Sequence, residues 1–396
     1  MFLPKGYRFA GVYSGVKTDP EKLDLSLVVS DYPAVAAGVY TMNLMCGATV
    51  HMNRTRTPGT GFRAVVTNSG CANDCTGDRG IRDAEEMAAR AAATTGTSPE
   101  QALVMSTGVI GEFLPMEKIR TGIAKAGERL AADEAAFERA ARGMMTTDTH
   151  PKMASRQFTL ANGKVVSIAG MCKGAAMIGP NMATMLAAIY TDAMLEPEQA
   201  QTLLKAVVDE TFNCIVVEGH TSPSDMVLLL ANGATCFEPL NGTDFDDFAV
   251  AFGEVCLELA KAIPNDGEGV SHFVTIEVTG CKDRDSAKII ADTISRDALV
   301  KAAIAGADPN WGRIVSAAGY SGVQFDITKV SLRINDYELF RDGVPFPFDA
   351  DMVSISLRDN RNVSIAISFG DGDANIRYWT TDLTEEYVRL NADYHT

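Results

Sequence analysis

The stretch Lys173-Gly-Ala-Ala-Met-Ile-Gly-Pro-Asn-Met-Ala-Thr184-Met-Leu186 decides how the rest of this sequence is interpreted. It follows residues 165–170, Val-Val-Ser-Ile-Ala-Gly, whose β-branched and apolar side chains predict a strand. Its glycines, proline and asparagine predict a tight loop. An apolar run then continues to Tyr190, and one hydroxyl residue, Thr184, stands at its start.

Two interpretations of Thr184 follow from the residues alone. In the first, it only caps a core element behind a glycine loop. In the second, it is a nucleophile released by self-cleavage, because a threonine hydroxyl needs a base beside it and a newly formed α-amine can supply that base. Such an amine has an ordinary pKa of about 7.7–8.0, close to working pH. The small Ala183 and the tight loop suit the N-to-O acyl shift that would cut the chain.

Strands and helices alternate around this stretch without a strict βαβ rhythm. Apolar and β-branched runs predict strands at 26–30, 63–67, 165–170, 273–279, 330–335 and 363–369. Amphipathic or alanine-rich runs with helix-start signals predict helices at 83–95, 115–130, 134–142, 197–210 and 246–263. The fold class is therefore α/β or α+β, with mixed sheets packed against helices.

Composition restricts the partners. The 396 residues, 46% of them hydrophobic, suffice for two or three packed units. Acidic residues outnumber basic ones by 51 to 35, a net charge of −16, which argues against nucleic acid or an anionic membrane as partner. No long apolar run or signal segment appears, so a cytoplasmic protein is expected. The histidines are scattered and the eight cysteines form no C-x-x-C pair, which predicts reduced thiols and no metal site.

The stretch that ends at Thr184 resembles the signature of the ornithine acetyltransferases, the glutamate N-acetyltransferases of arginine biosynthesis. The resemblance extends over nearly the whole chain. It includes Asn68-Ser-Gly-Cys-Ala-Asn73, Ser106-Thr-Gly-Val-Ile-Gly111, Met145-Thr-Thr-Asp-Thr149, Asp266-Gly-Glu-Gly269, Gly306-Ala-Asp-Pro-Asn-Trp-Gly-Arg313 and the terminal stretch Asp382–Thr396. Several such strings in the family's order are far more specific than any one of them.

The resemblance implies a DmpA/ornithine-acetyltransferase-like fold with an N-terminal-nucleophile site. It implies self-cleavage between Ala183 and Thr184, giving an α chain of residues 1–183 and a β chain of residues 184–396, assembled as an α2β2 heterotetramer. Thr184 would carry the acetyl group from N2-acetylornithine to glutamate in a ping-pong reaction that needs no cofactor. Whether acetyl-CoA also serves as donor stays open.

The resemblance also assigns roles to single residues. Thr107 and Gly108 would form the oxyanion hole, where a hydroxyl and a closely approaching backbone N–H suit the task. Substrate contacts are implied for Lys173, Glu268, Asn391 and Thr396, with Thr184 itself and a hydroxyl from Thr147 or Thr149. A lysine and a carboxylate fit an amino-acid substrate: Lys173 would hold its α-carboxylate and Glu268 the side-chain ammonium of ornithine.

One loop departs from the family's pattern. Residues 219–226 read Gly-His-Thr-Ser-Pro-Ser-Asp-Met, where the family usually shows Gly-Asp-Thr-Ser-Thr-Asn-Asp-Thr. Tolerated packing changes are the favoured interpretation, and a shift toward another acylated amino acid is the alternative. Two further interpretations of the whole chain stay open: a related N-terminal-nucleophile amidase or aminopeptidase, and a non-catalytic homologue.

Overall fold

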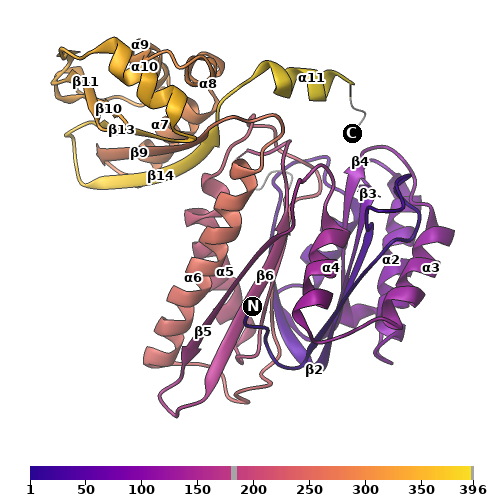
Figure 1. Cartoon of the computed structure of the whole chain (residues 1–396). Helices are drawn as coiled ribbons and strands as arrows, with labels where there is room; N and C mark the ends of the chain where they lie inside the picture. Colours follow the sequence, from indigo (N-terminus) through magenta and orange to yellow (C-terminus); the bar gives the residue numbers. More distant parts are fainter. Residues whose placement is uncertain (180–184, 394–396) are drawn as a thin grey trace. The chain divides into compact units, whose positions relative to one another are not determined.

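The computed structural model describes residues 1–179 and 185–393. Contacts between residues divide the chain into two compact units. The first contains Met1–Asn213 and His220–Ile263, and the second contains Cys214–Gly219 and the residues from Pro264 to the last described one. Each unit is built on one mixed sheet with helices (Figure 1). The mixed α/β architecture predicted from the sequence is confirmed.

The first unit contains a sheet with the strand order β4-β3-β2-β8-β7-β6-β5, and β1 pairs with β2 beside this path. The strands are β1 (Tyr7–Val12), β2 (Leu25–Tyr40), β3 (Gly59–Cys71), β4 (Ala102–Val109), β5 (Lys152–Thr159), β6 (Val165–Lys173), β7 (Leu186–Thr191) and β8 (Met226–Ala231). The pairs β3/β4 and β7/β8 are parallel and the other pairs are antiparallel. Strands β7 and β8 are buried along their whole length, as expected for adjacent strands inside a sheet covered on both faces.

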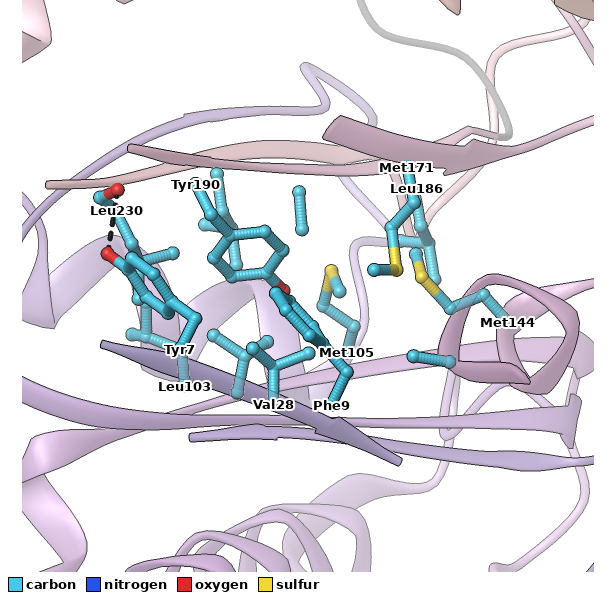
Figure 2. Packing of buried hydrophobic residues seen from close by; sticks show 14 of the residues in the cluster. Tyr7, Phe9, Val28, Leu103, Met105, Met144, Met171, Leu186, Tyr190 and Leu230 are labelled. Carbon is cyan, nitrogen blue, oxygen red and sulfur yellow. Dashed lines mark hydrogen bonds between the residues drawn. The ribbon is translucent and has the colours of Figure 1, made fainter. Parts of the chain in front are cut away.

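Helices cover both faces of this sheet. They are α1 (Ala48–Arg56), α2 (Gly77–Ala93), α3 (Met116–Gly127), α4 (Glu134–Met144), α5 (Pro197–Glu210) and α6 (Gly242–Asn265), with single 3₁₀ turns at Pro99–Gln101 and Phe212–Cys214. Helix α2 lies beside β3 and β4 (Figure 1), and α3 packs on β1 and β2. On the other side, Tyr7 and Phe9 pack against Tyr190 (Figure 2), and the Tyr7 hydroxyl donates a hydrogen bond to the Leu230 carbonyl oxygen over 3.0 Å.

Helix α2 begins six residues before the start predicted from sequence. The sequence pattern starts the helix at Asp83, where an alanine-rich run begins with acidic residues. In the structure, a Cβ on Gly80 would lie 1.9 Å from the Thr76 hydroxyl and 2.6 Å from the Asn73 amide oxygen. The turn directly before the helix therefore packs closely against its first residues and requires glycine at position 80.

The second unit contains a sheet with the order β12-β11-β10-β13-β9-β14. Its strands are β9 (Phe273–Cys281), β10 (Ser331–Ile334), β11 (Tyr337–Arg341), β12 (Val344–Pro345), β13 (Asn362–Ser368) and β14 (Ala374–Thr381). Its helices are α7 (Arg284–Arg296), α8 (Ala298–Ala305), α9 (Trp311–Gly319), α10 (Ala350–Asp359) and α11 (Glu385–Asp393), with a 3₁₀ turn at Ile327–Lys329. Strands β9 and β13 are parallel, and β14 closes one edge by antiparallel pairing with β9.

Three further features bear on function. All eight cysteines carry free thiols. Within residues 1–179 and 185–393, no helix is both long and apolar enough to cross a membrane. The same residues contain no group of three or more histidine, cysteine or acidic side chains arranged to hold a metal ion.

Candidate active site

In the first unit, the predicted residues lie at the ends of strands. Strand β4 ends just past Thr107 and Gly108, and β6 ends at Lys173. Lys173 pairs with Leu186 at the start of β7, and Leu186 pairs with Met226 at the start of β8. Lys173, Leu186 and Met226 therefore share one row of the sheet, because the ladder fixes their register. Thr107 belongs to another row, since it pairs with Ser69 near the start of β2.

The oxyanion motif and the predicted substrate lysine are in contact. The Lys173 ammonium donates a hydrogen bond to the Thr107 hydroxyl oxygen over 3.3 Å, and both side chains are buried. Gly108 has φ +129°, and a Cβ there would lie 2.3 Å from the Gly70 carbonyl carbon and 2.6 Å from the Cys71 nitrogen. Only glycine fits this position, on grounds both of backbone conformation and of space.

Asp148 lies in the sequence between the two candidate threonines, Thr147 and Thr149, and forms a buried ion pair with Lys152. One carboxylate oxygen of Asp148 accepts hydrogen bonds from the Lys152 ammonium (2.6 Å) and from the Gly174 backbone N–H (2.7 Å). Its other oxygen accepts the Thr146 N–H over 3.0 Å. Burial alone would raise the pKa of Asp148, but the ammonium groups of Lys152 and Lys173 together with the Gly174 N–H lower it to about 2.

This ion pair fixes the backbone beside Lys173, since Gly174 is the next residue. Thr147 is partly exposed and Thr149 is exposed. The Thr149 hydroxyl lies 2.9 Å from the Nδ1 atom of His150. Sequence reasoning misses the Asp148–Lys152 pair, because the sequence does not show whether a lysine is buried or exposed to solvent. The available signal is the spacing of four residues, which is too common to be specific.

The loop that departs from the family pattern leads directly into the start of β8. Its residues Ser222–Asp225 are buried, whereas His220 is exposed. The Ser224 hydroxyl donates a hydrogen bond to one carboxylate oxygen of Asp74 over 2.5 Å. Burial raises the pKa of Asp74 to about 7, although this hydrogen bond lowers it. The serine that replaces the usual amide thus has a defined partner inside the fold.

In the second unit, two predicted residues meet. The Asn391 side-chain amide donates hydrogen bonds to a Glu268 carboxylate oxygen and to the Tyr387 carbonyl oxygen, each over 3.0 Å. Glu268 is half-buried and Asn391 is exposed on α11. Both residues are substrate contacts that the resemblance implies, and the structure brings their side chains together. Ala183, Thr184 and Thr396 lie outside the described residues.

Comparison with known proteins identifies the family. The model of the ArgJ family matches residues 8–396, almost the whole chain. The chain belongs to the ArgJ family. The "Arginine biosynthesis bifunctional protein ArgJ" of Rhodopirellula baltica is 45% identical over 397 residues, covering 100% of this chain and 96% of the relative. The ArgJ protein of the same name from Geobacter sulfurreducens is 42% identical over 394 residues, covering 99% of each.

A solved structure supports the same assignment. The "Arginine biosynthesis bifunctional protein argJ" of Bacillus halodurans is similar with a TM-score of 0.51 and 36% sequence identity. The match covers 53% of this ArgJ chain and 100% of the solved one. As an ArgJ protein, the chain is an enzyme of the acyltransferase class. The family resemblance that the sequence motifs indicate is confirmed.

Proposed function

We propose that this ArgJ protein transfers an acetyl group from N2-acetyl-L-ornithine to L-glutamate by way of an acetyl ester on Thr184. The observation that carries the proposal is a contact: the Lys173 ammonium donates a hydrogen bond to Thr107 of the Thr107-Gly108 motif. Lys173 also pairs with Leu186 at the start of β7, two residues after Thr184. A nucleophile, donors for an oxyanion and a cation for a carboxylate are what transfer between two amino acids needs.

The nucleophile arises by self-cleavage in this proposal. The Thr184 hydroxyl oxygen adds to the Ala183 carbonyl carbon, the C–N bond breaks, and water then hydrolyses the resulting ester. Residues 1–183 and 184–396 become separate polypeptides, which assemble as α2β2. The solved structure from Bacillus halodurans supports this step, since one of its chains matches over its whole extent about half of this chain, the size of one such product.

Acetyl transfer then proceeds in two matched halves. The α-amine of Thr184 removes the hydroxyl proton as the oxygen attacks the acetyl carbonyl carbon. Thr107 and the backbone N–H at Gly108 stabilise the negative oxygen that forms, and the proton passes to the ornithine nitrogen as the C–N bond breaks. Glutamate reverses these steps: its amine attacks the ester carbonyl carbon and the proton returns to the threonine oxygen.

The substrate contacts belong to the same proposal. Lys173 holds the α-carboxylate, and Glu268 pairs with the side-chain ammonium of ornithine. Asn391 holds Glu268 through its amide, and Thr396 and a hydroxyl from Thr147 or Thr149 complete the contacts. Acetyl-CoA is the second donor to be tested, with no resident cofactor in either case.

The test is intact-protein mass spectrometry with donor and acceptor added separately. The expected result is two polypeptides and, after incubation with N-acetylornithine alone, a single acetyl adduct on the one that begins at Thr184. Addition of glutamate should remove the adduct and yield N-acetylglutamate. Thr184→Ala should give one full-length polypeptide without an adduct. Loss of the adduct to water at the same rate without glutamate would favour a hydrolytic amidase instead.

A further inference from the structure

The loop that carries Glu268 ends on a buried acid of the second unit. Asp382 directly follows β14, and its side chain is fully buried. Its Oδ1 atom accepts the backbone N–H groups of Ser271 over 3.0 Å and of His272 over 3.2 Å. Its Oδ2 atom accepts the Ser271 hydroxyl and lies 2.9 Å from the Nδ1 atom of His272. Asp382 therefore holds the end of the Glu268 loop through both of its oxygens.

The same loop is held against the beginning of α11. The Thr384 hydroxyl donates a hydrogen bond to the Gly269 carbonyl oxygen over 2.5 Å. A Cβ on Gly269 would lie 2.5 Å from the Tyr387 nitrogen, so the loop passes directly against the first turn of this helix. Further along α11, Asn391 reaches the Glu268 carboxylate. The position of Glu268 thus depends on how firmly the loop and the segment that leads into α11 are joined.

Both ring nitrogens of His272 face oxygen acceptors. Nε2 lies 3.0 Å from the Leu357 carbonyl oxygen, and Nδ1 faces Asp382. A neutral imidazole has one N–H and one bare lone pair, so in either tautomer one nitrogen would face an oxygen with no hydrogen between them. The Ser271 hydroxyl, 2.8 Å from Nδ1, has one hydrogen, and giving it to the ring would take it from Asp382. Only the doubly protonated ring serves both acceptors, so the geometry favours a cation.

The charges that face this ring agree with the geometry. The hydrogen bond from Asp382 raises the pKa of His272, whereas burial and the Arg361 guanidinium lower it. Arg361 lies on the opposite side of the loop and donates a hydrogen bond to the Ser271 carbonyl oxygen over 3.2 Å. Burial alone would raise the pKa of Asp382, but hydrogen bonds from His272 and Ser271 outweigh burial and lower it. The two shifts together stabilise an imidazolium paired with a carboxylate.

We propose that His272 is a positioning residue for the acetyl donor: as a cation paired with Asp382, it fixes the loop on which Glu268 receives the side-chain ammonium of N-acetylornithine. The inference rests on the proposed function, because it concerns the ammonium site named there. His272 acts through Asp382 and the loop. When the ring loses its proton at alkaline pH, a lone pair faces an oxygen, the loop loosens and donor binding weakens.

The first test compares His272→Gln with the wild type in steady-state kinetics. Glutamine keeps a side-chain N–H but carries no charge. At pH 7, kcat/KM for N-acetylornithine should fall about 10-fold, the effect expected when a hydrogen bond between charged groups is lost. The fall should come from KM, with kcat nearly unchanged, because the chemistry takes place at other residues. The kcat/KM for glutamate should stay nearly unchanged, since glutamate has no side-chain ammonium for Glu268.

The second variant, His272→Lys, keeps a cation at this position. Lysine has an ordinary pKa of about 10.4, so the variant should recover kcat/KM for the donor at pH 7 and hold it to about pH 9, where the wild type declines. The matched control is Lys329→Gln, which removes a cation from another ion pair of the second unit, with Asp371 over 3.1 Å. This control should leave the kinetics with both substrates in place.

Several outcomes would overturn the proposal. A folded His272→Gln enzyme with the wild-type kcat/KM for the donor would do so, and so would equal losses for donor and glutamate, which would indicate a general structural role. Parallel pH profiles of the wild type and His272→Lys would have the same meaning.

A third measurement needs no variant. In the wild type, the rate of acetyl-adduct formation from dilute N-acetylornithine should fall from pH 7 to about pH 9, as a raised histidine pKa is passed. A rate that stays level or rises over this range would contradict the role of His272. A wild type that takes no acetyl group from N-acetylornithine at any pH would instead refute the proposed function.

Discussion

The ammonium group of Lys173 donates a hydrogen bond to the hydroxyl oxygen of Thr107, which lies 66 positions earlier in the chain. A hydroxyl group has one hydrogen to donate and two lone pairs to accept with. Because the lysine uses a lone pair, the hydroxyl hydrogen of Thr107 stays available for a second oxygen. A cation on the oxygen also makes that hydrogen a stronger donor. The contact thus prepares Thr107 for the oxyanion role that we propose.

Removal of the Thr107 hydroxyl should slow the chemistry more than it weakens substrate binding. Thr107→Val should lower kcat for acetyl transfer by about 10²–10³-fold, the usual effect of losing one oxyanion donor. KM for N-acetylornithine should change little. Thr107→Ser keeps the hydroxyl and is the matched control, expected within about 10-fold of wild type. Steady-state kinetics on cleaved enzyme measures both, and equal losses in the two variants would contradict the hydroxyl's role.

Gly108 should tolerate no side chain. Gly108→Ala combines an unfavourable φ with overlap against the backbone of Gly70 and Cys71, so we expect it to lose about 3 kcal/mol or more of the free energy of unfolding. Gly111→Ala is the control: φ there is +85°, but nothing lies within 4 Å of its Cβ, so the expected loss is about 1–2 kcal/mol. Urea unfolding monitored by circular dichroism compares them. Similar losses would contradict the crowding at Gly108.

The buried acid Asp74 should make the uncut protein less stable as pH rises. The folded state holds its proton to about pH 7, whereas the unfolded chain loses it near pH 4, so stability falls between these values. The test adds Asp74→Asn to the uncut Thr184→Ala chain. The free energy of unfolding of this variant, relative to its parent, should increase by about 2–4 kcal/mol as the pH is raised from 4 to 8, because a tenfold difference in proton affinity corresponds to about 1.4 kcal/mol. Urea unfolding at several pH values measures this change. A difference that does not vary with pH would contradict the assignment.

Asp148 should show the opposite dependence. Its pKa of about 2 lies below the ordinary value, so its contribution to stability is complete above about pH 4 and disappears as pH falls toward 2. At pH 7, Asp148→Asn should cost about 3–5 kcal/mol, because it removes the carboxylate that faces the buried Lys152.

The double variant Asp148→Asn/Lys152→Met tests the cause of that loss. With both charges gone, much of the lost stability should return, since a buried cation no longer lacks its counter-charge. Thermal unfolding of the wild type, the single variant and the double variant measures the recovery. A double variant less stable than Asp148→Asn alone would show that packing, not charge, dominates at this position.

The sequence by itself determined the fold class, several of the longer helices and strands, and the family. Local periodicity is visible in one chain, so the pattern predicts α5 with its observed bounds, Pro197–Glu210. Motifs such as Ser106–Gly111 can be identified from residue order alone, without knowledge of their positions in the fold. Residue order is therefore sufficient to indicate the family. The Thr107-Gly108 motif indicates an oxyanion site for the same reason.

The tertiary structure alone decided which of these residues meet and in what electrostatic surroundings. Asp225 reaches Met185 because the sheet register sets the starts of β7 and β8 side by side. Lys173 reaches Thr107 although the two belong to different rows of the sheet, so the way the strands pack on one another decides this contact. Burial then separates acids that look alike in sequence: the pKa of Asp148 falls to about 2 beside two ammonium groups, and that of Asp74 rises to about 7 without one. Charge energies depend on distance and desolvation, which are properties of the folded chain and not of residue order.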